Sequence, residues 1–202
     1  MTPTVKSLPE RIRFAWWRGC LPLLAFAWLL PSASGAERKG SEAEVKAAAL
    51  SKIGDYARWP AGTFADARSP VVIGVMGRNL FEEELSEIVK IINENGAGHR
   101  LIVRQFKDDE PVENCQILFI AASEKARVPQ IIQRVQGKAV LTISDLDGFV
   151  TRQGGCLRLF VEDKALQFEV NLTAVEREKI TFNTGFLGLK GTRIIRDGKV
   201  VK

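Results

Sequence analysis

Apolar residues along this chain repeat with two different spacings, which alternate through most of its length. Between residues 42 and 59 they recur every three or four positions, which predicts an amphipathic helix. The apolar positions of this segment are Val45, Ala49, Ile53 and Tyr56. Ser41, with Glu44 three residues later, is typical of a capping box that begins a helix. Trp59 precedes a proline, which disfavours the helical conformation at Trp59 and predicts that the helix ends there.

The segments that follow contain short continuous apolar runs, which predict buried strands. These runs are at 71–76, 101–106, 115–121 and 139–144. Amphipathic segments lie between them and predict helices that end at Gly96 and Gly137, because glycine favours the left-handed conformation that follows a helix.

After residue 150 the pattern predicts antiparallel hairpins. The first pairs 155–161 with 165–170 across a tight turn, and the second pairs 192–196 with 200–201 across Asp197-Gly198. A short helix is expected at 171–178 and a short strand at 180–182. Because alternating strands and helices imply right-handed crossovers, we expect an α/β fold: a three-layer sandwich with a mixed, mainly parallel sheet and an antiparallel hairpin at the edge.

The first 36 residues have the pattern of an export signal. Four basic residues precede an apolar run at 21–30, and Ser34-Gly35-Ala36 places small residues at a cleavage position. The run is too short to span a bilayer comfortably, although an uncleaved anchor is the alternative. We therefore expect a secretory signal peptide at 1–36, a flexible lead-in at 37–41, an α/β domain at 42–191 and a basic C-terminal hairpin or tail at 192–202.

The net charge of the chain does not indicate one particular class of partner. The precursor carries 29 basic and 24 acidic residues, but four of the bases and one of the acids belong to the expected leader. Much of the remaining excess lies near the C-terminus, where an anionic lipid, an acidic partner or water alone are the alternatives. Because the basic residues are not interleaved with aromatic ones, we expect no binding to nucleic acid.

Residues with catalytic or metal-binding chemistry are few. The chain has one histidine, His99, in an expected loop, and no Gly-x-Ser-x-Gly motif accompanies it. Cys115 and Cys156 are the only cysteines after the leader, and their spacing does not resemble that of a zinc site. We therefore expect neither an enzyme nor a resident metal or cofactor.

Two weaker patterns indicate binding. Gly74 and Gly77 end a predicted strand and begin a helix, and Asp145 and Asp147 follow another strand, so these loops are candidates for a ligand site at the carboxyl edge of the sheet. Tight turning and turn-stabilising hydrogen bonds explain the same residues without a ligand.

The second pattern is aromatic. Trp59, Pro60 and Phe64 form an apolar group where the first helix ends and a loop begins, and such a group is a candidate for an exposed surface that binds a partner. Burial in the core is the alternative.

Several segments, in order, resemble the YfiR-like periplasmic proteins. They are VKAAALSKIGDYARWPAGTF (45–64), VVIGVMGRNLF (71–81), CQILFIAASE (115–124), VLTISDLDGFVTRQGGCLRLF (140–160) and LQFEVNLTAVEREKITFNTGFLGL (166–189). The resemblance covers nearly the whole expected domain. It implies an exported α/β regulator, often dimeric, that represses a membrane-bound diguanylate cyclase by binding the periplasmic region of that enzyme. It also implies an outer-membrane lipoprotein that sequesters the repressor and thereby raises cyclic-di-GMP output. A periplasmic small-ligand binding protein is the alternative function.

The two remaining cysteines leave two possibilities open. Cys115 and Cys156 each begin a predicted strand, so that a disulfide forms if those strands start as neighbours at one end of the sheet. Alternatively both are small buried hydrophobic residues on separate strands. In the resembled family a cysteine at the Cys115 position can pair with a partner nearer the first strand of the sheet, but 72–77 contains none here.

Overall fold

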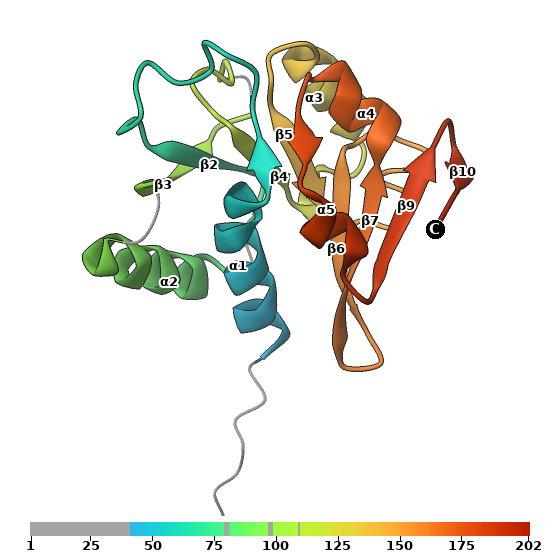
Figure 1. The fold of residues 1–202 in the computed structure, drawn as a ribbon, viewed down its shortest axis with the longest axis horizontal. Coiled ribbons are helices and arrows are strands. Elements are labelled where there is room, and N and C mark those ends of the chain that lie inside the picture. Colours follow the sequence, from blue (N-terminus) through green and yellow to red (C-terminus); the bar gives the residue numbers. More distant parts are fainter. Residues whose placement is uncertain (1–40, 79–80, 97–98, 109) are drawn as a thin grey trace, which may run out of the picture. The chain divides into compact units, whose positions relative to one another are not determined.

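An eight-stranded sheet forms the centre of the domain. The computed structural model describes residues 41–202 except 79–80, 97–98 and 109, so the expected signal peptide and nearly all of the lead-in lie outside the described residues (Figure 1). The strands follow one another across the sheet in the order β10 (Lys199–Val200), β9 (Thr192–Arg196), β7 (Ala165–Asn171), β6 (Leu157–Glu162), β5 (Leu141–Ser144), β4 (Ile117–Ile120), β2 (Val71–Met76) and β3 (Leu101–Phe106).

Most neighbouring strands in this sheet are parallel. From β3 to β6 each pair is parallel, as is the pair of β7 and β9, whereas β6–β7 and β9–β10 are antiparallel. The mixed, mainly parallel sheet with an antiparallel hairpin at its edge is therefore confirmed. The edge hairpin is β9–β10, while the β6–β7 hairpin lies inside the sheet because β9 adds beside β7.

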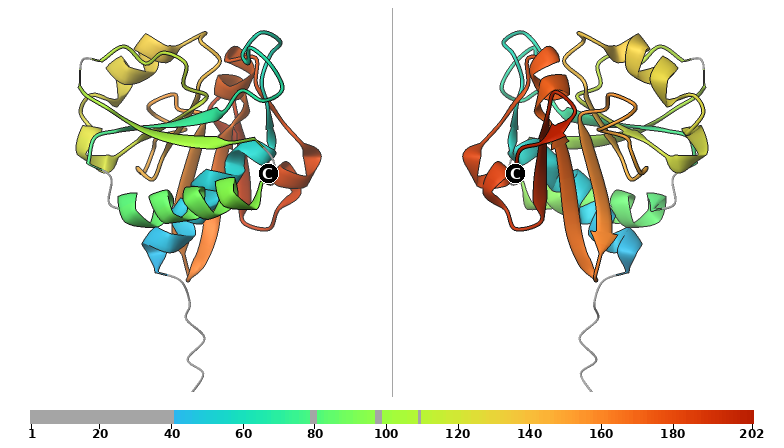
Figure 2. Two further views of the ribbon diagram at one scale, coloured as in Figure 1. Left: turned by 90° about the vertical axis from the view of Figure 1, so that its left-hand side faces the viewer. Right: turned by 90° about the vertical axis from the view of Figure 1, so that its right-hand side faces the viewer.

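Helices cover both faces of the sheet. They are α1 (Glu42–Lys52), α2 (Glu82–Asn95), α3 (Val128–Val135), α4 (Leu172–Arg177) and α5 (Thr184–Gly188), with short 3-10 turns η1 (Ile53–Asp55) and η2 (Ala122–Glu124). α1 and α2 lie side by side, well away from α3 (Figures 1 and 2). Ile117 and Phe119 of β4 pack in the same core as α1 and α2, while Leu118 and Ile120 pack with α3. Since successive strand residues point to opposite faces, the two cores lie on opposite sides of the sheet.

The first helix begins as the sequence predicts but ends earlier. The Ser41 hydroxyl accepts from the Glu44 N–H at 3.1 Å, and the Glu44 carboxylate accepts from the Ser41 N–H at 2.6 Å, so the capping box is confirmed. α1 ends at Lys52 rather than at Trp59. The chain beyond it forms β1 (Ala57–Arg58), which pairs antiparallel with β8 (Thr181–Phe182). This tertiary pairing outweighs the helical periodicity of the segment.

Gly74 allows the side chains of Phe106 and Cys115 to pack closely against the middle of β2. A Cβ atom at this position would lie 2.6 Å from the Phe106 ring and 2.7 Å from the Cys115 sulfur, closer than real Cβ contacts allow. The sequence offered Gly74 as part of a ligand loop. The structure places it inside the strand, beneath Phe106 and Cys115, where it serves packing.

Gly74→Ala is therefore expected to lower the free energy of unfolding by about 1–3 kcal/mol, because the buried ring and sulfur must move to admit the methyl group. Gly188→Ala is the matched control, since nothing lies within 4 Å of a Cβ atom there and the backbone is not left-handed. Urea denaturation of both variants measures the difference. Equal stability of the two would contradict this packing role.

Candidate functional site

The chain changes direction across the sheet at β2. It passes from β2 through α2 to β3 on one side, and then returns to the other side of β2 to form β4. The segments that follow β2 and β4 consequently leave toward opposite faces, with α2 packed in one core and α3 in the other. In open α/β sheets, such a reversal leaves a crevice at the carboxyl ends of the strands, where ligands commonly bind.

A cavity of about 220 Å³ occupies this position, and we call it the switch-point crevice. Its lining comes from the segments after β2, β4 and β5 and from the first turns of α1. The lining residues are Glu42, Ala43, Lys46, Arg78, Phe81, Phe119, Ala121, Ala122, Ser123 and Asp145. The crevice thus combines apolar walls with two basic and two acidic side chains.

Lys46 links α1 to the end of β5 across this crevice. Its ammonium lies 2.8 Å from a carboxylate oxygen of Asp145 and 2.8 Å from one of Glu42, and its side chain is only 12% exposed. Burial is the largest single influence on the pKa of Lys46 and lowers it, but the hydrogen bonds to Asp145 and Glu42 and the negative charges of these two residues together outweigh burial, so that the pKa is raised. The lysine therefore stays protonated at neutral pH and neutralises much of the acidic charge.

Gly77 and Ser123 hold the two diverging segments together. The Ser123 hydroxyl accepts from the Arg78 N–H at 2.9 Å. Gly77 has a φ of +86°, and a Cβ atom there would lie 2.5 Å from the Ser123 hydroxyl oxygen, so the turn requires glycine. The Arg78 side chain is exposed and lines the crevice. It has no ion pair or hydrogen bond to another described side chain.

Asp147, which the sequence also proposed as a ligand-loop residue, lies outside this crevice. Asp147 lies 2.7 Å from Arg152 and 3.4 Å from Arg158, and it does not line the cavity. Its hydrogen bond to Arg152 is the main cause of a lowered pKa. Of the four candidate ligand-loop residues, only Asp145 lines the crevice, and Gly77 forms the tight turn that precedes Arg78. Sequence reasoning missed Lys46 and Arg78, because both looked like ordinary exposed cations.

A second surface is aromatic, and we call it the aromatic groove. Trp59 and Phe64 meet edge to face with ring centroids 5.8 Å apart, and Phe64 stacks on His99 at 5.5 Å. Trp59, Pro60 and Phe64 are all partly exposed, as a surface that binds a partner requires. The Trp59 indole N–H is buried and has no hydrogen-bond partner. The groove has a volume of about 390 Å³, and Arg58, Val71 and Leu101 also line it.

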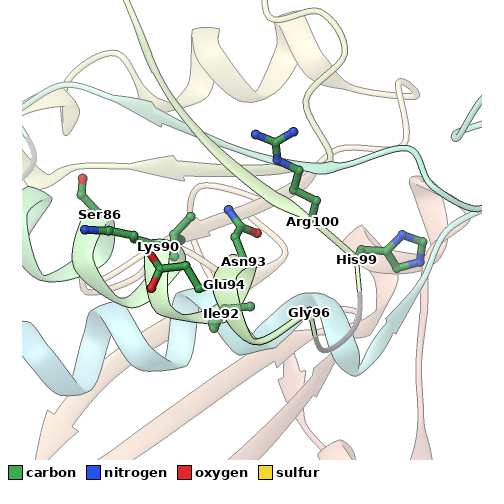
Figure 3. A pocket seen from close by; sticks show the side chains of 9 residues that line it. Ser86, Lys90, Ile92, Asn93, Glu94, Gly96, His99 and Arg100 are labelled. Carbon is green, nitrogen blue, oxygen red and sulfur yellow. The ribbon is translucent and has the colours of Figure 1, made fainter.

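His99 also belongs to a neighbouring depression of about 560 Å³ beside α2. Figure 3 shows Ser86, Lys90, Asn93 and Glu94 along α2, with Gly96, His99 and Arg100 at its end. The His99 Nδ1 lies 3.2 Å from the Ser69 carbonyl oxygen. The histidine that the sequence placed in a solvated loop therefore joins two adjoining surface hollows.

This part of the surface borders the open edge of the sheet. β3 is the last strand in the order, so that one of its sides carries no neighbouring strand in the described chain. Ile91 on α2 is 48% exposed and Ile102 on β3 is 40% exposed. Large exposed apolar side chains beside an open strand edge are typical of surfaces that bind another protein.

In a comparison with known protein families, a model described as YfiR/HmsC-like matches residues 43–189. The chain belongs to this family. The match includes the aromatic groove and every crevice residue except Glu42, and it ends before β9. Comparison with individual curated proteins finds none that matches.

Two classes of feature are absent from the described part of this YfiR/HmsC-like protein. Within residues 41–202, leaving aside the five positions not described, none of the helices combines the length and the apolar character that a membrane span needs. Over the same residues, no three histidine, cysteine, aspartate or glutamate side chains lie together in a way that could hold a metal ion.

The cysteines of this family member do not pair in the structure. Cys115 packs in the α3 core and Cys156 in the α1–α2 core, so their sulfur atoms lie on opposite faces of the sheet, and both thiols are free. The Cys115–Cys156 bond that the sequence left open is therefore not formed. Burial is the main cause that raises the pKa of Cys115 to about 12, and burial also raises the pKa of Cys156.

We expect both thiols to resist iodoacetamide in the folded protein at pH 8, because only the thiolate reacts. With a pKa of about 12, on the order of one Cys115 thiol in 10⁴ is ionised at that pH. After unfolding in guanidinium without reductant, mass spectrometry of the leaderless protein should show two labels. Labelling that appears only after a reductant is added would show that the two cysteines are bonded.

Proposed function

We propose that this YfiR/HmsC-like protein is exported to the periplasm and represses a membrane-bound diguanylate cyclase by binding the periplasmic region of that enzyme. The observation that carries this proposal is the family match over 147 consecutive positions, residues 43–189. The leader-like pattern of residues 1–36 supports export. In this proposal the protein acts by binding and catalyses no reaction.

The aromatic groove is the proposed docking surface for the cyclase. Binding energy at protein interfaces is concentrated in a few aromatic or arginine side chains that bury fully in the complex. Trp59 and Phe64 present ring surface that is already held in place by their edge-to-face contact, so that little conformational entropy is lost when a partner covers it.

The same surface is proposed to be where a competitor binds and thereby releases the cyclase. An outer-membrane lipoprotein that covers the aromatic groove would compete with the cyclase and so raise cyclic-di-GMP output. A second copy of the chain is a further proposed partner, at the open edge of β3. Both proposals follow from the family resemblance and from the position of this surface at the edge of the sheet.

Phe64→Ala is expected to reduce capture of the cyclase at least tenfold, because a buried aromatic anchor contributes about 2 kcal/mol or more to binding. The measurement is crosslinking in intact cells, followed by purification of the tagged full chain and quantification of the crosslinked cyclase. Phe160→Ala is the matched control, since Phe160 is a partly exposed ring on β6, where Arg158 lies over it.

The melting temperatures of both variants separate binding from folding. Trp59 and Phe64 both pack partly against the α1–α2 core, so the loss of either ring also costs stability. If Phe64→Ala and Phe160→Ala capture the cyclase equally well, the groove is not the docking surface. If no diguanylate cyclase is crosslinked to the unmodified chain, the proposed function itself fails.

A further inference from the structure

The switch-point crevice holds more hydrogen-bond donors than the protein itself uses. The Lys46 ammonium has three protons, of which Asp145 and Glu42 accept two. The Arg78 guanidinium has five N–H groups and no acceptor among the described side chains. The hydrogen-bonding groups that Lys46 and Arg78 leave unused are therefore all donors.

The acidic groups of the crevice offer less to a ligand. Asp145 and Glu42 already share the Lys46 ammonium at 2.8 Å each. Glu42 is 62% exposed and thus largely hydrated, whereas the Asp145 side chain is 23% exposed. A cationic ligand would have to displace or compete with Lys46, while an anion can bind Arg78 without breaking an existing ion pair.

The other walls of the crevice are apolar. Phe81 and Phe119 meet edge to face with centroids 5.0 Å apart, and Ala43, Ala121 and Ala122 complete the lining. The volume of about 220 Å³ equals roughly seven water molecules at about 30 Å³ each. That is smaller than the usual cavity for a drug-sized molecule, so that only a compact ligand fits.

We propose that the switch-point crevice binds a small organic carboxylate, with the carboxylate on Arg78 and the apolar body against Phe81 and Phe119. The planar guanidinium matches the two oxygens of a carboxylate, which gives a stronger bond than a neutral group can make. This site lies at the carboxyl edge of the sheet, where the sequence had placed its alternative of small-ligand binding. It does not depend on the proposed action on a cyclase.

Benzoate is the probe, with benzamide as its neutral isostere and benzylammonium as its cationic counterpart. Each is titrated into the ¹⁵N-labelled protein purified from the envelope after export, while the amide shifts of Arg78 and Ser123 are followed. We expect saturable shifts with benzoate and at least tenfold weaker binding of benzamide, because a charge-assisted hydrogen bond is lost.

Variants locate the site. Arg78→Met keeps most of the side chain's length but removes its charge, and it is expected to weaken benzoate binding about tenfold or more. Arg100→Met is the matched control, since Arg100 is also exposed but lines the depression beside α2. Ala122→Leu fills part of the crevice from an exposed position and should weaken benzoate and benzamide alike.

Several results would overturn the proposal. Equal affinity for benzoate and benzamide would show that the carboxylate is not recognised, and unchanged affinity in Arg78→Met would show that Arg78 does not bind it. Tighter binding of benzylammonium would assign the crevice to cations. Shifts that never saturate would mean that no site exists. Because none of these measurements involves a cyclase, they leave the proposed function untouched.

Discussion

The order in which strands are added on the two sides of β2 is the constraint on which the rest of this structure depends. β3 is added on one side and β4 on the other, and right-handed crossovers then place α2 and α3 on opposite faces. The segments after β2 and β4 diverge as a result and open the switch-point crevice. Lys46 of α1 bridges part of that opening through its hydrogen bond to Asp145. The two residues are 99 positions apart in the chain.

The local elements were largely predictable, because the spacing of apolar residues reports which face of an element is buried. The capping box at Ser41, the glycine cap at Gly96 and the strand at 71–76 are all found where the sequence predicts them. The early end of α1 was not predictable from this spacing. It arises because β1 pairs with β8, more than 120 positions further along the chain.

The candidate sites were predictable only in part. Asp145 followed from the rule that ligands bind at the carboxyl ends of strands. Gly74 was assigned to the same loop from its position near Gly77. However, Phe106 of β3 and Cys115, which precedes β4, pack over Gly74, and no local pattern contains this contact between distant segments. The unpaired state of Arg78 and the ion pairs of Lys46 also depend on tertiary placement. The aromatic group at Trp59 and Phe64 could be recognised from sequence because its members are close together in the chain.

The two surfaces have different chemistry. The aromatic groove is a partly exposed apolar surface beside an open strand edge, which suits another protein. The switch-point crevice is small and combines donors with apolar walls, which suits a compact anion.

We propose that the protein represses a diguanylate cyclase from outside the cytoplasm. The most direct test is the cellular cyclic-di-GMP content, measured by mass spectrometry, in cells that lack the protein, that carry the full chain, or that carry a cytoplasmic form lacking residues 1–36. We expect cyclic-di-GMP to rise without the protein and only the full chain to restore the lower level. An unchanged level in its absence, or equal restoration by the cytoplasmic form, would contradict this proposal.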